Sequence, residues 1–394
     1  MTPAPTPLSE SERFDWLRLS RSDGIGPRTF VGLLQRFGSA AATIEAFPRL
    51  AKQRSGLRLA DADAIRRELD LAAKRGRRIV GLGEPEYPPA LRVTDSAPPV
   101  ITVAGNLAVL QRPMVAVVGS RNASAVGAIF ADRLSRGLGS AGFIVVSGLA
   151  RGIDAKAHLA ALPTGTVAVL ASGHDRIYPE DHTRLAAEIA EHGAVISEMP
   201  ASWEARARDF PRRNRIVSGL SLGTVVVEAA RRSGSLITAR FANEQGREVF
   251  AVPGSPLEPR AEGTNDLIRQ GATLCASADD VIATLQSMHM PSTPSANFSA
   301  WEEVDDNDRL FLDLDQNSGE DTPTSAESPG LGAMGSRDGV LSLLGPVPTS
   351  IDDLSRLSGL NAAELRGLLT DLEIDGVVTR HAGDLVSRAT DTVS

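Results

Sequence analysis

Apolar positions follow two different periods along this chain. Between residues 112 and 271, short apolar runs rich in β-branched residues alternate with longer stretches whose apolar side chains recur at helical spacing. The runs are apolar nearly throughout, as is typical of strands covered on both faces of a sheet. We therefore predict an α/β fold with an extended Rossmann-like, doubly wound and mostly parallel sheet. The predicted strands are Met114–Val118, Ile144–Ser147, Val167–Ala171, Ala194–Ser197, Thr224–Val227 and Val249–Val252.

The N-terminal region shows helical periodicity instead. Apolar helices around residues 14–19 and 30–37 flank a tight turn that Gly24 and Gly26 make possible. This pattern fits a helix-hairpin-helix, in which the turn amides and the next helix N-terminus can hold a DNA phosphate without reading bases. It also fits a sterile-alpha-motif-like bundle that packs helices or binds proteins, which we favour because Gly-x-Gly-Pro turns also simply join helices. The sequence leaves both interpretations open.

The C-terminal stretch from 339 to 387 predicts three helices followed by a hairpin, which is the order of a winged helix. Asn361 is a good N-cap for the third helix, with Glu364 three residues later, and leucines between 365 and 372 supply its buried face. Arg366 is the one cation on this helix among four acidic residues. We therefore favour a protein-interaction or regulatory module over a reader of the major groove.

Charge and composition divide the chain further. The net charge of −8 comes largely from residues 301–330, which hold ten acidic residues and one arginine, whereas residues 1–80 hold 15 basic and nine acidic residues. The overall acidity therefore does not exclude a nucleic-acid partner for the folded parts. We predict a helical domain over 1–80, a sheet domain over 81–286, an acidic disordered linker over 287–335 and a winged-helix domain over 336–390.

The cysteine content and the first residues of the chain bear on the cellular compartment. Cys275 is the one cysteine, so no internal disulfide can form, and a single thiol fits a reducing compartment. The first residues lack the basic start and apolar stretch of a secretory signal, and no apolar run approaches about 18 residues. We expect a cytoplasmic protein without a membrane partner.

Small, donor-rich and cationic residues follow several predicted strands. Gly119, Ser120 and Arg121 end the first strand and open a helix, an arrangement that suits a phosphate. Gly148 and Arg151 follow the second strand, and a third run, FPRRNR over residues 210–215, places three arginines within four residues. Because the carboxyl ends of parallel strands share one rim of a sheet, these loops should converge. We predict an anion-binding surface rather than a reaction centre.

Cofactor and metal chemistry receive little support. The spacing GSRNASAVG departs from the dinucleotide fingerprint, and no acidic residue ends the second strand to hold a ribose. Asp154 and His158 stand four residues apart on a helix, where they could bind a metal or relay a proton, but a capping aspartate and a packed histidine explain the pair better. We predict no cofactor and no metal.

Between Glu86 and about Gly271 the ordered motifs resemble the DNA-processing protein A family, also called Smf. They include VAVVGSRNASAVG, VVSGLARGIDAKAH, TVAVLASGHDRIYPEDH, FPRRNRIVSGLS and VVVEAARRSGSLITA. The resemblance implies a non-enzymatic protein of natural transformation that coats and protects incoming single-stranded DNA, forms a homodimer and hands the strand to the RecA recombinase. It also implies that the strand-binding residues are Gly119, Ser120, Arg121, Ser147, Gly148, Arg151, Phe210, Arg212, Asn214 and Arg215.

The resemblance further implies roles for single residues. Arg121 would neutralise phosphates with help from Arg151, Phe210 would stack on a base, and the loop glycines would admit the strand closely. Family members often have lysine where Arg151 stands, so the charge is kept while the geometry of the contact differs.

Two other functions compete with DNA binding. A phosphoribohydrolase-like enzyme acting on nucleoside monophosphates would use Gly223, Thr224 and Glu228, although the spacing departs from that family's loop and Glu228 could instead tie down Arg231 or Arg232. A protein-binding scaffold would place the arginines in salt bridges. Only the DNA-binding hypothesis predicts an affinity for single strands that falls steeply with salt.

Overall fold

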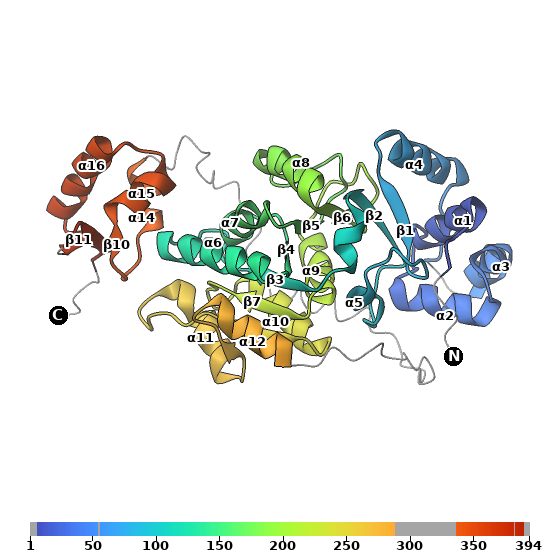
Figure 1. Ribbon diagram of the computed structural model, residues 1–394. Helices are drawn as coiled ribbons and strands as arrows, with labels where there is room; N and C mark the ends of the chain where they lie inside the picture. The colour runs from blue at the N-terminus through green and yellow to red at the C-terminus, as the bar shows by residue number, and fades with distance from the viewer. Residues whose placement is uncertain (1–5, 54–55, 288–335, 382, 390–394) are drawn as a thin grey trace.

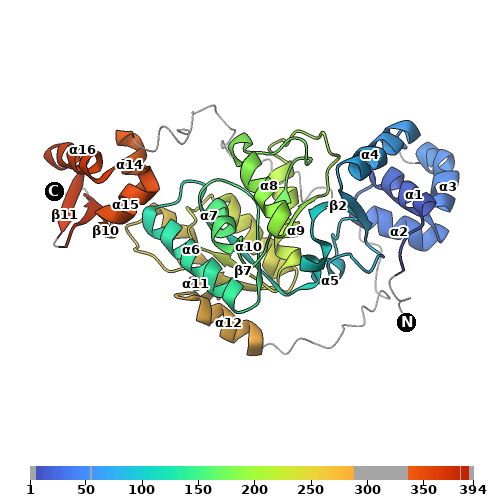
Figure 2. The ribbon, with the colours of Figure 1, turned by 45° about the horizontal axis from the view of Figure 1, so that its top comes forward.

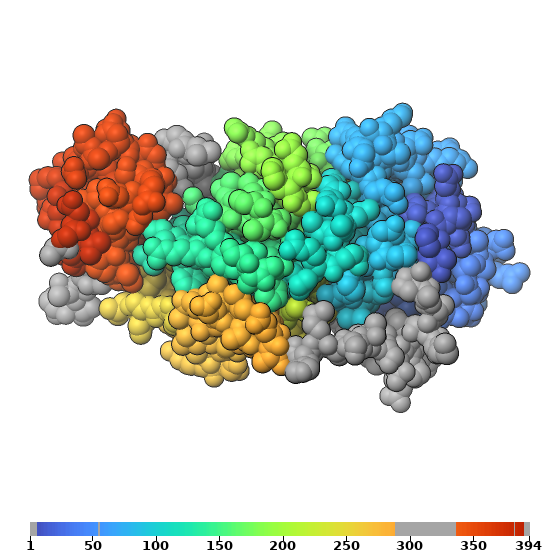
Figure 3. Space-filling view, in the orientation of Figure 1, coloured from blue at the N-terminus to red at the C-terminus, as the bar shows by residue number. Residues whose placement is uncertain are grey.

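The computed structural model describes residues 6–53, 56–287, 336–381 and 383–389. Figure 1 shows a helical region at the N-terminal end, a central sheet with helices on both faces, and a small third domain at the opposite end. The space-filling view in Figure 3 shows the same three parts in a row. Most of the predicted acidic linker, residues 288–335, lies outside the described residues.

Four helices form the N-terminal region: α1 (Glu10–Ser20), α2 (Pro27–Phe37), α3 (Ala40–Gln53) and α4 (Ala62–Lys74). Helix α1 begins with a capping box, in which Ser9 and Glu12 each satisfy a backbone amide of the other. Trp16 and Phe30 meet edge to face at 5.1 Å in the small core. The region is fastened to the sheet domain by an ion pair between Arg13 and the buried Glu84 at 2.5 Å.

The central sheet has the strand order β1-β2-β6-β5-β4-β3-β7-β8-β9 in the described chain. Strands β1 and β2 pair antiparallel to each other, β2 pairs antiparallel to β6, and every other neighbouring pair is parallel, which confirms the mostly parallel sheet. The strands are β1 (Arg78–Gly81), β2 (Val100–Gly105), β3 (Met114–Val118), β4 (Ile144–Ser147), β5 (Thr166–Leu170), β6 (Ala194–Ser197), β7 (Gly223–Val226), β8 (Glu248–Ala251) and β9 (Thr273–Leu274).

The six predicted strands are all present. Strands β3, β4 and β6 have the predicted bounds, and β5, β7 and β8 are shifted by one residue toward the N-terminus. The sequence interpretation did not identify β1, β2 or β9 as strands.

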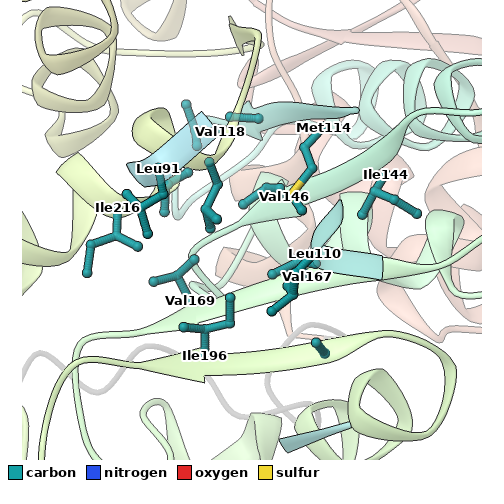
Figure 4. Close-up of a cluster of buried hydrophobic side chains, with 14 of the residues drawn as sticks. Leu91, Leu110, Met114, Val118, Ile144, Val146, Val167, Val169, Ile196 and Ile216 are labelled. Atoms are coloured by element: carbon teal, nitrogen blue, oxygen red, sulfur yellow. The ribbon is translucent and has the colours of Figure 1, made fainter. Parts of the chain in front are cut away.

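Helices cover both faces of the sheet because every central strand alternates its side chains between two cores. In β3, Met114 and Ala116 join a core with α9 and α10, whereas Val115 and Val117 join a second core with α6, α7 and α12. Figure 4 shows part of the first core, in which each fully buried valine or isoleucine contributes about 1.5–3 kcal/mol. The helices are α5 (Pro89–Arg92), α6 (Ala125–Ser140), α7 (Ile153–Ala161), α8 (Thr183–His192), α9 (Asp209–Leu220), α10 (Gly234–Glu244), α11 (Glu262–Arg269) and α12 (Ala278–Ser287), with short 3-10 turns η1 (Leu107–Gln111), η2 (Glu180–His182) and η3 (Pro259–Ala261).

The connections of the sheet reverse direction beside β3. Strands β3 to β6 follow one another outward on one side, whereas β7 to β9 add on the other side of β3. The topological switch point therefore lies between β3 and β7, and the loops after the parallel strands gather at this carboxyl rim.

The C-terminal domain is a winged helix, as predicted. It comprises α14 (Arg337–Leu343), β10 (Thr349–Ser350), α15 (Ile351–Ser358), α16 (Ala362–Ile374), β11 (Val378–His381) and β12 (Leu385–Arg388), with the sheet order β10-β12-β11. Asn361 and Glu364 form the predicted capping box. The domain lies beside the α6 end of the sheet domain in Figure 2, where Ala125 joins its leucine core and Arg260 donates to the carbonyl of Ser342 at 2.8 Å.

Candidate nucleic-acid interface

The loop after β3 leads into α6 at the switch point. A side chain at Gly119 would lie 2.7 Å from Ile153, so glycine is needed here for packing between the loop and α7. The Ser120 hydroxyl accepts from the amide of Asn122 at 3.1 Å and shapes the turn. Arg121 is exposed at the tip of the loop.

The loop after β4 touches the first loop backbone to backbone. Gly152 has φ +75°, and a Cβ there would lie 2.2 Å from the carbonyl oxygen of Ser120. The buried carboxylate of Asp154 accepts from the amides of Gly148 and Ala150 at 3.1 and 3.3 Å and so holds the loop in shape. Burial raises the pKa of Asp154, which nearby Arg213 partly opposes. Asp154 is thus a structural residue rather than a metal ligand, but it holds the preceding loop and does not cap α7, whose N-cap is Gly152.

Three further candidates, at the end of β4 and in this loop, have partners within the protein. The Ser147 hydroxyl is fully buried and donates to the carbonyl of Val117 at 2.6 Å. Gly148 is buried against the guanidinium of Arg213, which donates to its carbonyl. Arg151 is half-exposed and pairs with Asp181 at 3.0 Å, in a segment that follows β5. The structure therefore places Arg151 at the surface and Ser147 below it.

The three arginines of the FPRRNR run have different environments. Arg213 is buried and donates to the carbonyl of Val169 at 2.5 Å, and burial lowers its pKa to about 10. Arg215 is 2% exposed and pairs with the carboxylate of Glu198 at 2.6 Å. Arg212 is 42% exposed and contacts the same carboxylate at 3.2 Å. Only Arg212 of this run can reach a ligand on the surface.

Glu198 is the shared anchor of this run. Burial raises its pKa, but the guanidiniums of Arg215 and Arg212 together hold the pKa of Glu198 below its ordinary value. Asn214 donates to the carbonyl of Gly234 at 3.2 Å and so links α9 to α10. Like Arg215, it already has a hydrogen-bond partner inside the protein.

Arg121 lies over an aromatic pair at the rim. Its Cζ is 5.1 Å from the ring centroid of Phe210, in the first turn of α9. Phe210 in turn meets Tyr178 edge to face, with centroids 5.3 Å apart and planes at 66°. Tyr178 follows β5 and is 48% exposed. The loops after β3 and β5 and the start of α9 are therefore joined through these three side chains.

Exposed cations extend this rim. Arg206 lies over the ring of Trp203 at 4.9 Å, and Arg208 is exposed immediately before α9. Within the part of the chain that the structure describes, the guanidiniums of Arg121, Arg206 and Arg208 form no ion pair with a carboxylate within 4.0 Å. The backbone amide of Arg206 donates to the carboxylate of Asp209 at 2.9 Å. We define the strand rim as Arg121, Arg151, Tyr178, Arg206, Arg208, Phe210 and Arg212.

Sequence analysis missed three members of the strand rim, Tyr178, Arg206 and Arg208. The signal for Tyr178 was its position after a predicted strand, because every such loop reaches the same rim. Arg206 and Arg208 lie between β6 and α9 in a segment without periodicity, so their exposure at the rim depends on how the loop folds.

The switch point itself contains a carboxylate. Glu228, at the end of β7, accepts from the amide of Ser124 at 2.9 Å and from its hydroxyl at 2.5 Å, at the N-terminus of α6. The expectation that Glu228 ties down Arg231 or Arg232 is wrong, since Arg231 instead lies 3.6 Å from Glu262. Glu228 occupies the helix N-terminus where a nucleotide phosphate would bind, which argues against the phosphoribohydrolase-like enzyme.

A cavity of about 300 Å³ lies beside Glu228. Its walls include Phe130, Val252, Cys275 and, from the winged helix, Val347. Burial raises the pKa of Glu228 and raises that of the Cys275 thiol to about 12. The lining contains two carboxyl side chains, Glu228 and Glu258, and no lysine or arginine, so the cavity is a poor site for a phosphate.

The described residues contain no cluster of three or more His, Cys, Asp or Glu side chains with metal-binding geometry. His158 is buried with Nδ1 2.8 Å from the hydroxyl of Thr166, and burial lowers its pKa to about 3, so it is a neutral packed histidine. Across the described segments, no helix is both long and apolar enough to cross a membrane.

Comparison with known proteins identifies the family. The family model for DNA recombination-mediator protein A matches residues 78–286, and models for a DprA-like N-terminal HHH domain and a DprA winged-helix domain match residues 10–71 and 323–384. The N-terminal match supports the helix-hairpin-helix interpretation.

Individual relatives agree with the family models. Protein Smf of Synechocystis is 31% identical over 95% of this chain and 98% of its own length, and Protein Smf of Escherichia coli is 46% identical over 56% of this chain and 60% of its own length. The crystal structure of DNA processing protein A from Streptococcus pneumoniae is 32% identical, with a TM-score of 0.59 over 71% of this chain and 98% of that one. The chain belongs to the DNA recombination-mediator protein A (DprA/Smf) family and has a role in DNA processing.

Proposed function

We propose that this protein binds single-stranded DNA along the strand rim and acts in natural transformation, protecting the incoming strand and loading RecA onto it. The observation that carries the binding proposal is the group of exposed arginines without carboxylate partners, Arg121, Arg206 and Arg208, at the carboxyl rim of the sheet. Guanidiniums left unpaired at the surface are suited to bidentate contacts with phosphate oxygens.

The arrangement of the loops supports a backbone ligand. Gly152 and Ser120 meet without side chains between them, so the first two loops form a narrow, rigid base for Arg121 and Arg151. Arg151 and Arg212 are held near their places by Asp181 and Glu198, and a phosphate could recruit them from these half-exposed ion pairs at small cost.

The members of the predicted site then divide by role. Arg121, Arg151 and Arg212 would contact phosphates, and Phe210 a base. Other predicted residues would support these side chains from inside the protein, because their polar groups are already hydrogen-bonded there or another side chain packs against them. They are Ser147, Gly148, Asn214 and Arg215. RecA transfer, homodimer formation and a cytoplasmic location are proposed from family membership.

The direct test is the salt dependence of strand binding. Fluorescence anisotropy of a labelled oligothymidine should give a steep fall of log affinity against log salt for the wild type. The slope should be shallower by about 0.7 for Arg121→Ala, because one phosphate contact is lost. Arg136→Ala is the matched control, since Arg136 is an exposed arginine in the C-terminal half of α6, paired with Asp132. Equal slopes for the two variants, or no binding by the wild type, would refute the proposal.

A further inference from the structure

We propose that Tyr178 is a base-binding residue of the strand rim, one that selects unpaired nucleobases. This inference rests on the proposed strand-binding function and adds a residue for which no role has been assigned. Its ligand is an unpaired nucleobase whose flat face packs on the exposed face of the tyrosine ring.

The ring of Tyr178 faces solvent. Tyr178 is 48% exposed, although an aromatic ring is normally buried when the fold offers a place for it. In the described chain its hydroxyl makes no hydrogen bond, so no polar contact explains why the ring faces outward.

The second argument is that the exposed ring is held firmly. Ile177 packs against the core below α8, and Pro179 is buried, so both neighbours of Tyr178 are fixed. The same loop is tied to the β4 loop through His182, whose Nδ1 lies 2.9 Å from the carbonyl of Leu149. A ring placed in advance costs little conformational entropy when a base stacks on it.

The third argument comes from the neighbouring ring. The guanidinium of Arg121 lies over the Phe210 ring, 5.1 Å from its centroid, and Tyr178 meets the same ring edge to face. The Phe210 side chain itself is only half-exposed. Phe210 therefore supports both Arg121 and Tyr178, and Tyr178 offers the more accessible ring. Arg121 and Tyr178 contact the same Phe210 ring, so a phosphate bound at Arg121 would place an adjacent base near Tyr178.

The chemistry of such a site selects single strands. In a duplex each base is paired and stacked and presents only its edges, whereas an unpaired base exposes a face that any aromatic ring can bind. Stacking is insensitive to salt, in contrast to the contacts of Arg121 with phosphate. The two contributions can therefore be separated by experiment.

The test compares Tyr178→Ala, Tyr178→Leu and Tyr178→Phe on two ligands: a labelled oligothymidine and an abasic deoxyribose-phosphate strand of equal length. We expect Tyr178→Ala to bind oligothymidine about 5- to 100-fold more weakly than the wild type, with an unchanged salt slope. Tyr178→Leu should show most of this loss although it keeps an apolar side chain, and Tyr178→Phe should stay within about twofold of the wild type. All four proteins should bind the abasic strand equally.

Other outcomes overturn the inference in distinguishable ways. If Tyr178→Ala binds oligothymidine as tightly as the wild type, or loses the same factor on the abasic strand, Tyr178 does not stack on a base even though strand binding stands. If the wild type itself fails to bind oligothymidine, the proposed function fails and the base site with it. Circular dichroism of each variant establishes that it is folded.

Discussion

The guanidinium of Arg215 donates to the carboxylate of Glu198 at 2.6 Å, and both side chains are almost completely buried. Arg215 also donates to the backbone carbonyl of Ser96, so one side chain links α9 to the segment before β2. A sequence run that suggested three equivalent cations therefore contains at least one residue whose role is to join parts of the core.

Arg215→Ala should lower the free energy of unfolding by about 3–5 kcal/mol, because it leaves the buried Glu198 carboxylate without its closest partner. Urea denaturation measures the loss. Arg136→Ala, which removes an exposed pair, should change stability by less than about 1 kcal/mol. A fully stable Arg215→Ala protein that no longer binds oligothymidine would instead place Arg215 in the DNA contact.

Gly152→Ala should disturb the strand rim more than the same substitution at another glycine with positive φ. Gly152 and Gly142 both have positive φ, so alanine is strained at either site. Only at Gly152 does the new methyl group collide with the Ser120 carbonyl, since Gly142 faces open space. We expect Gly152→Ala to weaken oligothymidine binding and Gly142→Ala to leave it unchanged, as measured by anisotropy. Equal binding by both variants would show that contact between the first two loops is not required.

Removing two cations together should change the salt dependence further. Arg206→Ala combined with Arg208→Ala should lower the slope of log affinity against log salt by about 1.4, because two phosphate contacts are lost. The folded state should be little affected, since both side chains are exposed. Anisotropy titrations at several salt concentrations give the slope. An unchanged slope would remove these residues from the strand rim.

Buried neutral histidines should make the fold sensitive to acid. Burial lowers the pKa of His158 to about 3 and that of His174 to about 4, whereas in the unfolded chain both are near 6.5. Between these values the unfolded state binds more protons, so stability is present above about pH 6.5 and is lost as pH falls. Each histidine should contribute up to about 1.4 kcal/mol per pH unit in that window.

Urea denaturation between pH 7 and pH 5 tests this expectation. His158→Gln should reduce the pH dependence of the unfolding free energy relative to the wild type, even if the variant is less stable at pH 7. The same pH dependence in both proteins would mean that His158 binds its proton as readily in the folded state as in the unfolded state.

Much of this architecture follows from the sequence. The apolar runs at 114–118, 144–147 and 194–197 predicted strands with the observed bounds, because a strand covered on both faces must be apolar along its whole length. Asn361 and Glu364 predicted the start of α16, because helix capping depends only on residues within one turn. Strand β1 was missed because its four residues, RIVG, are too short a run to separate from a loop, whereas β2, VITVAG, has the β-branched pattern of a strand and was overlooked.

The sequence by itself determined six of the sheet strands, the helix order of the C-terminal domain, the order of the loops at one rim and the resemblance to the family. Only the tertiary structure decided which arginines can meet a ligand. Arg121, Arg213 and Arg215 have the same side chain, yet one is exposed over Phe210, one is buried beneath Gly148 and one is paired with Glu198. The reason is physical: local sequence sets backbone conformation, whereas burial and ion pairing depend on residues far apart in the chain that meet only after folding.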